Sequence, residues 1–301
     1  MVWYKAGSVD ESYGKGGSAH LLEHLMFRGT DKVKDGRFNT IMEENGVQSN
    51  AFTSYDFTAY HQFADISRLE VLLALEADRM RNLNFSDEAF AAEQKIVVQE
   101  RKQTVENNPS SEFYERLNLL FWGNSPYGQP IGGFSDEIMA LTAGDMRAFY
   151  RKFYAPNNAI LVLSGDIDVQ TAKPLVEKYF AKLKAEKIER AIPVDMRAPF
   201  NETLQMSLPD VKTIKVEQRF MLPHYEESQP SFYAYLLLAE YLGGGETAEL
   251  YRSLVVADKK AVAVSANYRF VTRGNSVFSL TMLPRENEYN NLSAAVELLQ
   301  Q

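Results

Sequence analysis

The stretch Ser18-Ala19-His20-Leu21-Leu22-Glu23-His24-Leu25 decides how this chain is interpreted, because it combines a helix-forming run with three chemically active side chains. On a helix, His20 and His24 lie one turn apart on one face, at a spacing suited to holding one metal ion. Glu23 lies close to the same face, where its carboxylate can accept a proton from a water molecule. The stretch therefore predicts two metal ligands and a general base.

The order His-x-x-Glu-His inverts the His-Glu-x-x-His motif of zinc peptidases. The whole chain has only 4 histidines, and two of them are in this pentapeptide. The alternative is an ordinary core helix that packs through Leu21, Leu22 and Leu25 and whose histidines make structural hydrogen bonds. We favour the metal site, because a helix cap precedes the run and Gly29 follows it where a helix end favours glycine.

Composition limits the classes of protein that the chain can belong to. Its 301 residues, 45% of them hydrophobic, predict two domains with well-filled cores. A net charge of −8 argues against nucleic acid as a partner. No apolar run reaches membrane-spanning length, which predicts no membrane span. The absence of cysteine excludes disulfides, thiolate zinc sites and a cysteine nucleophile.

Hydrophobic periodicity predicts strands and helices that are intermixed along the chain, with a hairpin as well as crossovers, and this favours an α+β layered fold. The predicted strands are 2–6, 47–53, 57–64, 159–164 (a buried strand), 213–222, 261–270 and 276–283. The predicted helices are 19–27, 38–45, 66–82, 87–106, 111–121, 142–153, 169–184, 230–242 and a final one at 294–301, and 126–133 is expected to be a turn-rich loop.

Charge and proline mark a linker at 187–200 between an N-terminal metal-bearing domain, 1–186, and a C-terminal domain, 201–301. The second domain contains a faint repeat of the metal helix at 234–240. There Tyr235, Leu238 and Ala239 take the places of His20, Glu23 and His24 respectively, so this domain lacks the metal motif. The chain opens directly on a strand and stops within a helical pattern, so we expect a fragment of a longer protein with an incomplete second domain.

A catalytic zinc ion requires a third protein ligand and an open position. His61 is expected on a strand face and His224 in a loop, so a carboxylate must serve. Glu93 and Glu100 are seven residues apart on one face of the helix 87–106. Spacing alone does not choose between them.

The run from Gly16 to Thr30 closely resembles the pitrilysin-type zinc peptidases, or inverzincins, a family that includes insulin-degrading enzyme and mitochondrial processing peptidase. The resemblance is closest to the small bacterial members. It implies that Glu100 is the third ligand of one Zn²⁺ per chain and that Glu93 orients the site as a neighbour of the ligands. It also implies that Asn50 and Ala51, in the stretch Asn50-Ala51-Phe52-Thr53, bind the substrate backbone.

The same resemblance implies two similar α+β domains, each a mainly antiparallel sheet with helices packed on one side, and a zinc-dependent endopeptidase acting on extended peptides or small unfolded polypeptides. The family's Arg…Tyr pair, which stabilises the oxyanion, falls here on Val255 and Val262. A second family chain that supplies the pair, or a homodimer, is therefore expected as partner. Bacterial relatives suggest the periplasm or secretion. The alternatives are a structural or assembly subunit of the same family, or a truncated chain that binds zinc without closing a chamber.

Overall fold

The computed structural model describes residues 1–34, 36–190, 203–207, 211, 214–227, 229–270 and 273–285. The chain divides into two compact units, of which the first comprises 1–119 and 126–192 and the second comprises 120–125 and 193–301. Most of the predicted linker, the start of the predicted strand at 213 and the predicted C-terminal helix lie outside the described residues. Within the described part, no helix combines the length and apolar character needed to cross a membrane.

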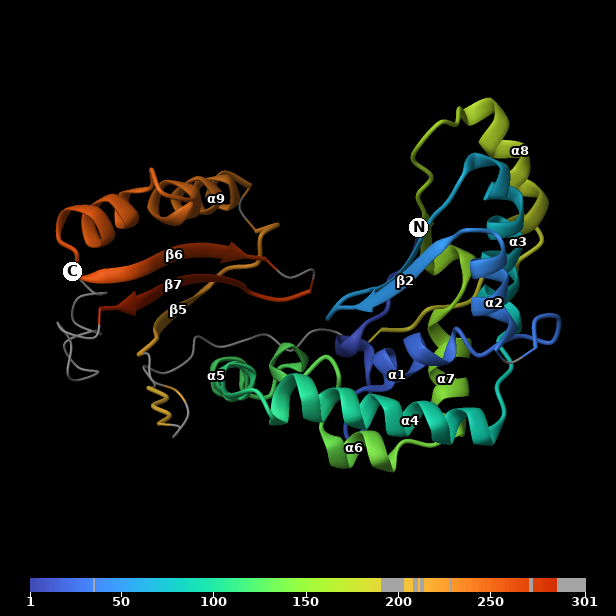
Figure 1. Ribbon diagram of the computed structural model, residues 1–301, viewed down its shortest axis with the longest axis horizontal. Coiled ribbons are helices and arrows are strands. Elements are labelled where there is room, and N and C mark those ends of the chain that lie inside the picture. The colour runs from blue at the N-terminus through green and yellow to red at the C-terminus, as the bar shows by residue number, and fades with distance from the viewer. Residues whose placement is uncertain are drawn as a thin grey trace. The chain divides into compact units, whose positions relative to one another are not determined.

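The first unit contains a four-stranded antiparallel sheet, and Figure 1 shows its strand β2 (Gln48–Thr53) above the helices α1 (Ser18–Leu25) and α4 (Asp87–Arg101). Its order is β2 (Gln48–Thr53), β3 (Thr58–Phe63), β1 (Val2–Tyr4) and β4 (Ala159–Leu161). Val2 is paired with Tyr60 on one side and with Leu161 on the other. The expected hairpin is β2–β3, in which Ala51 is paired with Tyr60. The antiparallel sheet predicted from the sequence is confirmed.

Helices pack against the face of this sheet that carries Val2, Tyr4 and Tyr60, all of which are buried. Tyr4 and Tyr60 on this face share one core with Phe153 and with Leu21, which lies in the helix that carries His20 and His24. The helices that begin in this unit are α1 (Ser18–Leu25), α2 (Arg37–Glu44), α3 (Leu69–Asn82), α4 (Asp87–Arg101), α5 (Pro109–Trp122), α6 (Ser135–Ala140), α7 (Ala143–Phe153) and α8 (Val169–Phe180). The helix α1 packs against α4 and α7 as well as against the sheet.

The structure corrects two expectations in this unit and adds one helix that was not predicted. The strand predicted as buried at 159–164 is the short edge strand β4, and its outward-facing Ile160 is 49% exposed. An apolar run does not distinguish a central strand from an edge strand. The helix predicted at 87–106 changes to a π-helical turn, Lys102–Glu106, after Arg101. Helix α6 was not predicted, because six residues are too few for a clear helical period.

The second unit contains a three-stranded antiparallel sheet in the order β5 (Val216–Leu222), β7 (Ser276–Pro284) and β6 (Ala261–Arg269). The helix α9 (Gln229–Gly243) packs against β6. Gly243 allows this close approach, since a Cβ atom there would lie 2.0 Å from the backbone nitrogen of Ala266. A π-helical segment, Tyr251–Ala257, precedes β6.

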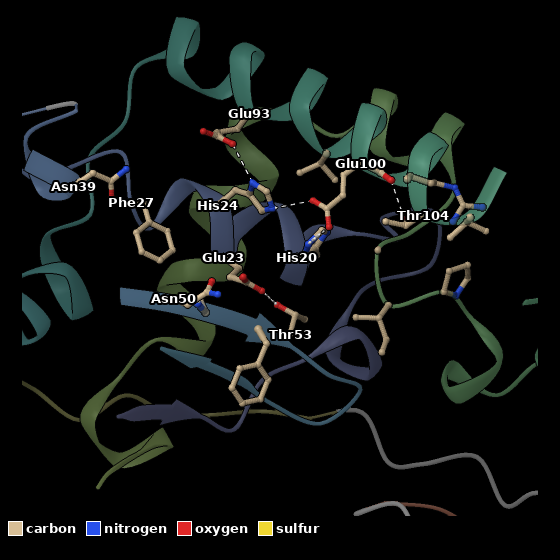
Figure 2. A pocket seen from close by; sticks show the side chains of 18 residues that line it. His20, Glu23, His24, Phe27, Asn39, Asn50, Thr53, Glu93, Glu100 and Thr104 are labelled. Atoms are coloured by element: carbon tan, nitrogen blue, oxygen red, sulfur yellow. Dashed lines mark hydrogen bonds and ion pairs between the residues drawn. The ribbon is translucent and has the colours of Figure 1, made fainter. Parts of the chain in front are cut away.

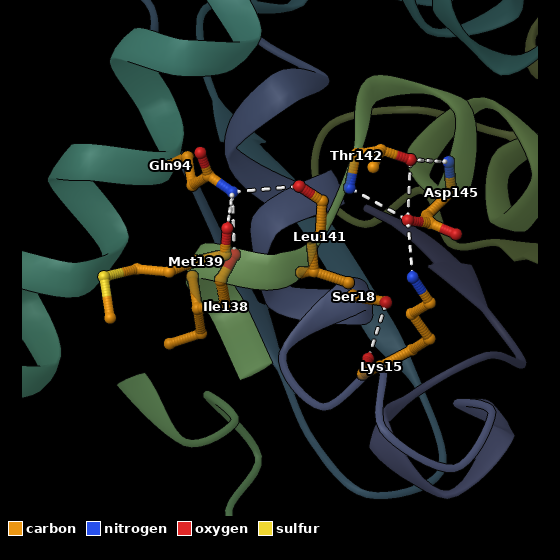
Figure 3. A network of polar contacts seen from close by, with 8 residues as sticks. All are labelled: Lys15, Ser18, Gln94, Ile138, Met139, Leu141, Thr142 and Asp145. Carbon is orange, nitrogen blue, oxygen red and sulfur yellow. Dashed lines mark hydrogen bonds and ion pairs between the residues drawn. The ribbon is translucent and has the colours of Figure 1, made fainter. Parts of the chain in front are cut away.

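A network of polar contacts links the segment 138–145 to both α1 and α4 (Figure 3). The side-chain amide of Gln94 in α4 donates to the carbonyls of Ile138 at 2.8 Å and Leu141 at 3.0 Å. Asp145, which caps α7 together with Thr142, pairs at 2.9 Å with Lys15 in the loop before α1. These contacts hold α4 and the start of α1 to one connecting segment.

Candidate metal centre

Helix α1 begins at a tightly built loop and presents its polar face to α4. Gly17 is the N-cap residue with φ of +84°, and a Cβ atom there would lie 2.6 Å from the carbonyl oxygen of Gly132. The carboxylate of Glu11 accepts hydrogen bonds from the backbone N–H groups of Gly17 at 3.0 Å and Ala19 at 2.8 Å. The first turn of α1 is thereby fixed directly before His20.

Two imidazoles and one carboxylate converge between α1 and α4 (Figure 2). The rings of His20 and His24 have centroids 4.9 Å apart. From α4, one carboxylate oxygen of Glu100 lies 3.8 Å from His20 Nε2, and the other lies 3.5 Å from His24 Nε2. Among the residues that the structure describes, this is the only group of three or more potential ligands with donor atoms within 4.8 Å of one another.

The donor set fits a zinc ion. Tetrahedral ligands that are each about 2.0–2.2 Å from zinc lie roughly 3.4 Å from one another, close to the separations between the carboxylate oxygens and the imidazole nitrogens. Two imidazoles and one carboxylate are also a donor set of catalytic zinc sites, which leave the fourth position open.

Glu93 lies about two helical turns before Glu100 on α4 and is beside His24. Its Oε2 is 3.1 Å from His24 Nδ1, so it can accept the proton on that nitrogen and leave Nε2 free for a metal. Its Oε1 accepts from Arg28 Nε at 2.6 Å. Burial alone would raise the pKa of Glu93, but the hydrogen bond with His24 and the cation of Arg28 lower it below its ordinary value. Val97, which lies between Glu93 and Glu100, is buried, whereas Ile96 is not.

The surroundings shift the pKa values of the two histidines in opposite directions. Burial, and then the neighbouring His24, lower the pKa of His20 to about 4, although Glu100 opposes the shift. Burial also acts to lower the pKa of His24, but the hydrogen bond to Glu93 and the nearby carboxylates outweigh it and raise that pKa. His20 Nδ1 is buried and has no hydrogen-bond partner within the described chain.

Glu23 is buried and faces the cleft from α1, next to β2. Its Oε2 accepts a hydrogen bond from the hydroxyl of Thr53 at 2.5 Å. Burial raises the pKa of Glu23, although the Thr53 hydroxyl acts in the other direction. A carboxylate with a raised pKa and a fixed orientation is suited to move protons near neutral pH.

A cleft of about 780 Å³ is lined by both histidines and by Glu23, Glu93 and Glu100. Asn50 and Ala51 of β2 also line it. Since β2 is bonded only to β3 in the described sheet, its other edge is available along the cleft. The structure thus brings both residues of the predicted substrate-binding pair to the same cleft as the histidines. His61 is on β3 and His224 follows β5, and neither belongs to the ligand group.

Sequence reasoning missed two side chains that touch this site, Arg28 and Thr53. Each lies in a quoted motif, Arg28 four residues after His24 and Thr53 three residues after Asn50. Arg28 could have been identified from its position four residues after His24, because this spacing places it on the same face, just beyond the end of α1. No local signal pairs Thr53 with Glu23, since the two residues meet only through packing of β2 on α1.

Comparisons with known proteins agree on one family. Residues 1–133 match the family model described as Insulinase (Peptidase family M16), and residues 140–301 match the model described as Peptidase M16 inactive domain. The zinc protease PqqE of Helicobacter pylori is 33% identical over 282 residues, which are 92% of this chain and 62% of that protein. The beta subunit of the mitochondrial-processing peptidase of Lentinula edodes is 27% identical over 182 residues, covering 60% of this chain and 39% of that protein.

Solved structures give the same result. A protease from Helicobacter pylori superposes with a TM-score of 0.86 at 29% identity and covers 99% of this chain and 71% of its own. The periplasmic protease PqqL from Escherichia coli superposes with a TM-score of 0.83 at 19% identity, covering 99% of this chain and 34% of its own, and so shares the fold. The chain spans about 62% and 58% of the length of the first two curated relatives that it matches.

Proposed function

Because this chain belongs to the insulinase family of peptidases (family M16), we propose that it is a zinc-dependent endopeptidase acting on extended peptides or small unfolded polypeptides. The observation that carries the proposal is the convergence of His20, His24 and Glu100 beside the buried carboxylate of Glu23. When bound there, Zn²⁺ supplies a Lewis acid that acidifies water and polarises a carbonyl group.

Three residues around the cleft have separate roles in the proposed mechanism. Glu23 accepts the proton of the attacking water and passes it to the leaving amine. The hydroxyl of Thr53 fixes one carboxylate oxygen of Glu23, so the other oxygen faces the reacting groups. Glu93 holds His24 in the tautomer that keeps Nε2 unprotonated.

The edge of β2 is the proposed binding surface for the substrate backbone. An extended peptide adds a strand to a free sheet edge through main-chain hydrogen bonds. Asn50 and Ala51 lie on this edge and line the cleft, which supports the proposal. Such binding selects for extended segments, because a folded substrate has its own backbone groups already paired.

Oxyanion stabilisation by side chains requires a partner in this proposal. Val255 and Val262, where the resemblance places the family's Arg…Tyr pair, are apolar and cannot donate hydrogen bonds. We propose that a second family chain supplies this pair in a heterodimer, and that a homodimer is the alternative assembly.

A non-catalytic structural or assembly subunit is the second candidate function. The match of residues 140–301 to a model described as an inactive domain favours it. The ligand group argues against it, because a purely structural subunit does not need an open three-ligand site next to a buried general base.

The test is the variant Glu23→Gln, assayed for zinc content and for cleavage of an unstructured quenched-fluorescence peptide, with and without a copurifying family chain. We expect zinc at one equivalent and no cleavage for the variant, against zinc and cleavage for the parent. Full cleavage by the variant would remove Glu23 from its role. Stoichiometric zinc without turnover in the parent, even with the second chain present, would favour the structural subunit.

A further inference from the structure

We propose that Arg28 is a positioning residue of the metal site, which fixes the carboxylate of Glu93 so that one of its oxygens always faces His24. The inference rests on the proposed zinc site, to which it adds a residue that touches neither metal nor substrate. Arg28 follows α1, four residues after His24, and its backbone N–H still donates to the Leu25 carbonyl at 3.0 Å.

The two oxygens of Glu93 have separate partners. Both Nε and Nη2 of Arg28 contact Oε1, with Nε at 2.6 Å. Oε2 is left for His24 Nδ1 at 3.1 Å. Rotation of the carboxylate would break both contacts at once, so Arg28 fixes the angle at which the second oxygen meets the imidazole. A charge-assisted contact through two N–H groups provides this geometric control, which a single point charge does not.

The burial of Glu93 makes the position of its carboxylate depend on the contact with Arg28. The side chain of Glu93 is only 8% exposed, whereas that of Arg28 is 28% exposed. A buried carboxylate needs a cation or several donors to remain where it is. With Arg28 removed, Glu93 keeps only its contact with His24 among the interactions described here, and the carboxylate can turn toward water. The ring of His24 then loses the partner that selects its tautomer and orientation.

A simpler role for Arg28 is to join the end of α1 to α4 without affecting the metal. The two roles differ in what they predict for zinc affinity. A purely structural contact changes the stability of the metal-free protein and leaves intrinsic zinc affinity alone. A positioning role weakens zinc binding, and does so only while Glu93 is present to transmit the effect.

The experiment measures zinc affinity by competition with a chromophoric chelator, using Zn²⁺ alone and no substrate. The variants are Arg28→Met, Glu93→Gln and the double variant, and the melting temperature of each metal-free protein is recorded alongside. Arg116→Met is the matched control, because Arg116 Nε and Nη2 also converge on a single oxygen, that of Glu112, in the exposed part of α5.

We expect Arg28→Met to bind zinc about tenfold more weakly, as removal of a partner of a metal ligand does in other sites. The same change in the Glu93→Gln background should produce little further loss, and Arg116→Met should bind zinc like the parent. Should Arg28→Met fail to fold, Arg28→Lys serves instead and should show a smaller loss, because an ammonium group keeps the charge without the paired N–H groups.

Zinc affinity unchanged in a folded Arg28→Met variant would overturn the inference, and so would equal losses in the parent and Glu93→Gln backgrounds. A parent protein that binds no zinc would instead refute the proposed function. If the parent binds zinc but cleaves no peptide, the test of Arg28 can still be interpreted, since it measures zinc affinity and does not use activity.

Discussion

Replacing Arg79 by methionine should strongly destabilise the N-terminal unit, because it leaves a buried carboxylate without its cation. Arg79 and Glu76 are 1% and 3% exposed, and they are joined at 2.5 and 3.0 Å through two nitrogens of the guanidinium. The guanidinium carbon also lies 4.3 Å from the ring centre of Tyr60 and 4.9 Å from that of Phe38. Aromatic rings therefore pack against the guanidinium, in addition to the carboxylate that it binds.

The expected loss of stability follows from the burial of this ion pair. Removing one partner of a buried ion pair costs about 3–5 kcal/mol, because the remaining charge stays desolvated. For a unit of this size, that cost corresponds to a drop in melting temperature of roughly 6–20 °C. The double variant Glu76→Leu/Arg79→Met should recover most of the loss, since an apolar pair of similar volume needs no compensation.

The assay is thermal unfolding of the metal-free protein followed by circular dichroism, so that zinc binding does not contribute to the measured stability. A melting temperature of Arg79→Met within a few degrees of the parent would refute the reasoning. A double variant as unstable as the single one would also refute it, because the loss would then come from the aromatic contacts and not from the isolated charge.

Three further outcomes follow from the contacts around the cleft. Thr53→Val should lower kcat about tenfold or more with zinc content unchanged, because the carboxylate of Glu23 loses a hydrogen bond from the Thr53 hydroxyl. Thr53→Ser keeps a hydroxyl and should retain activity. Equal activity of Thr53→Val and the parent would contradict the role given to this hydroxyl. Burial alone would raise the pKa of Asp145, but its hydrogen bonds and the ion pair with Lys15 bring that pKa below 3.8. The charged Asp145 therefore stabilises the folded protein above about pH 4, and this contribution is lost as the pH falls further. Asp145→Asn should thus melt below the parent at neutral pH, and the difference should shrink as the pH falls below about 4; a difference that stays constant on this acidification would exclude this linkage. His61→Ala should bind one equivalent of zinc like the parent, since His61 is not part of the ligand group, and loss of zinc would show that the group is incomplete.

Local pattern was sufficient to predict most of the elements. The hairpin at 48–63 and helices α1, α3 and α7 all lie where periodicity and turn residues predict them, because their hydrophobic faces repeat over enough residues to be recognised. The failures are features that have no local period. Helix α6 is too short for a clear period. The π-helical turn after Arg101 contains no glycine or proline that would mark a change of helix type. The edge position of β4 depends on which strands pair beside it.

The sequence alone specified the face that carries His20, Glu23 and His24, because a spacing of three and four residues on a helix sets their relative positions without help from the rest of the chain. Tertiary packing decided which carboxylate meets them. Glu93 and Glu100 are equivalent by spacing, and only the packing of α4 against α1 puts Glu100 beside both Nε2 atoms and Glu93 beside Nδ1 of His24. The same holds for Arg28 and Thr53, whose partners are 65 and 30 residues away along the chain. Distances between elements are set by how the whole core fills its volume, and no short stretch of sequence contains that information.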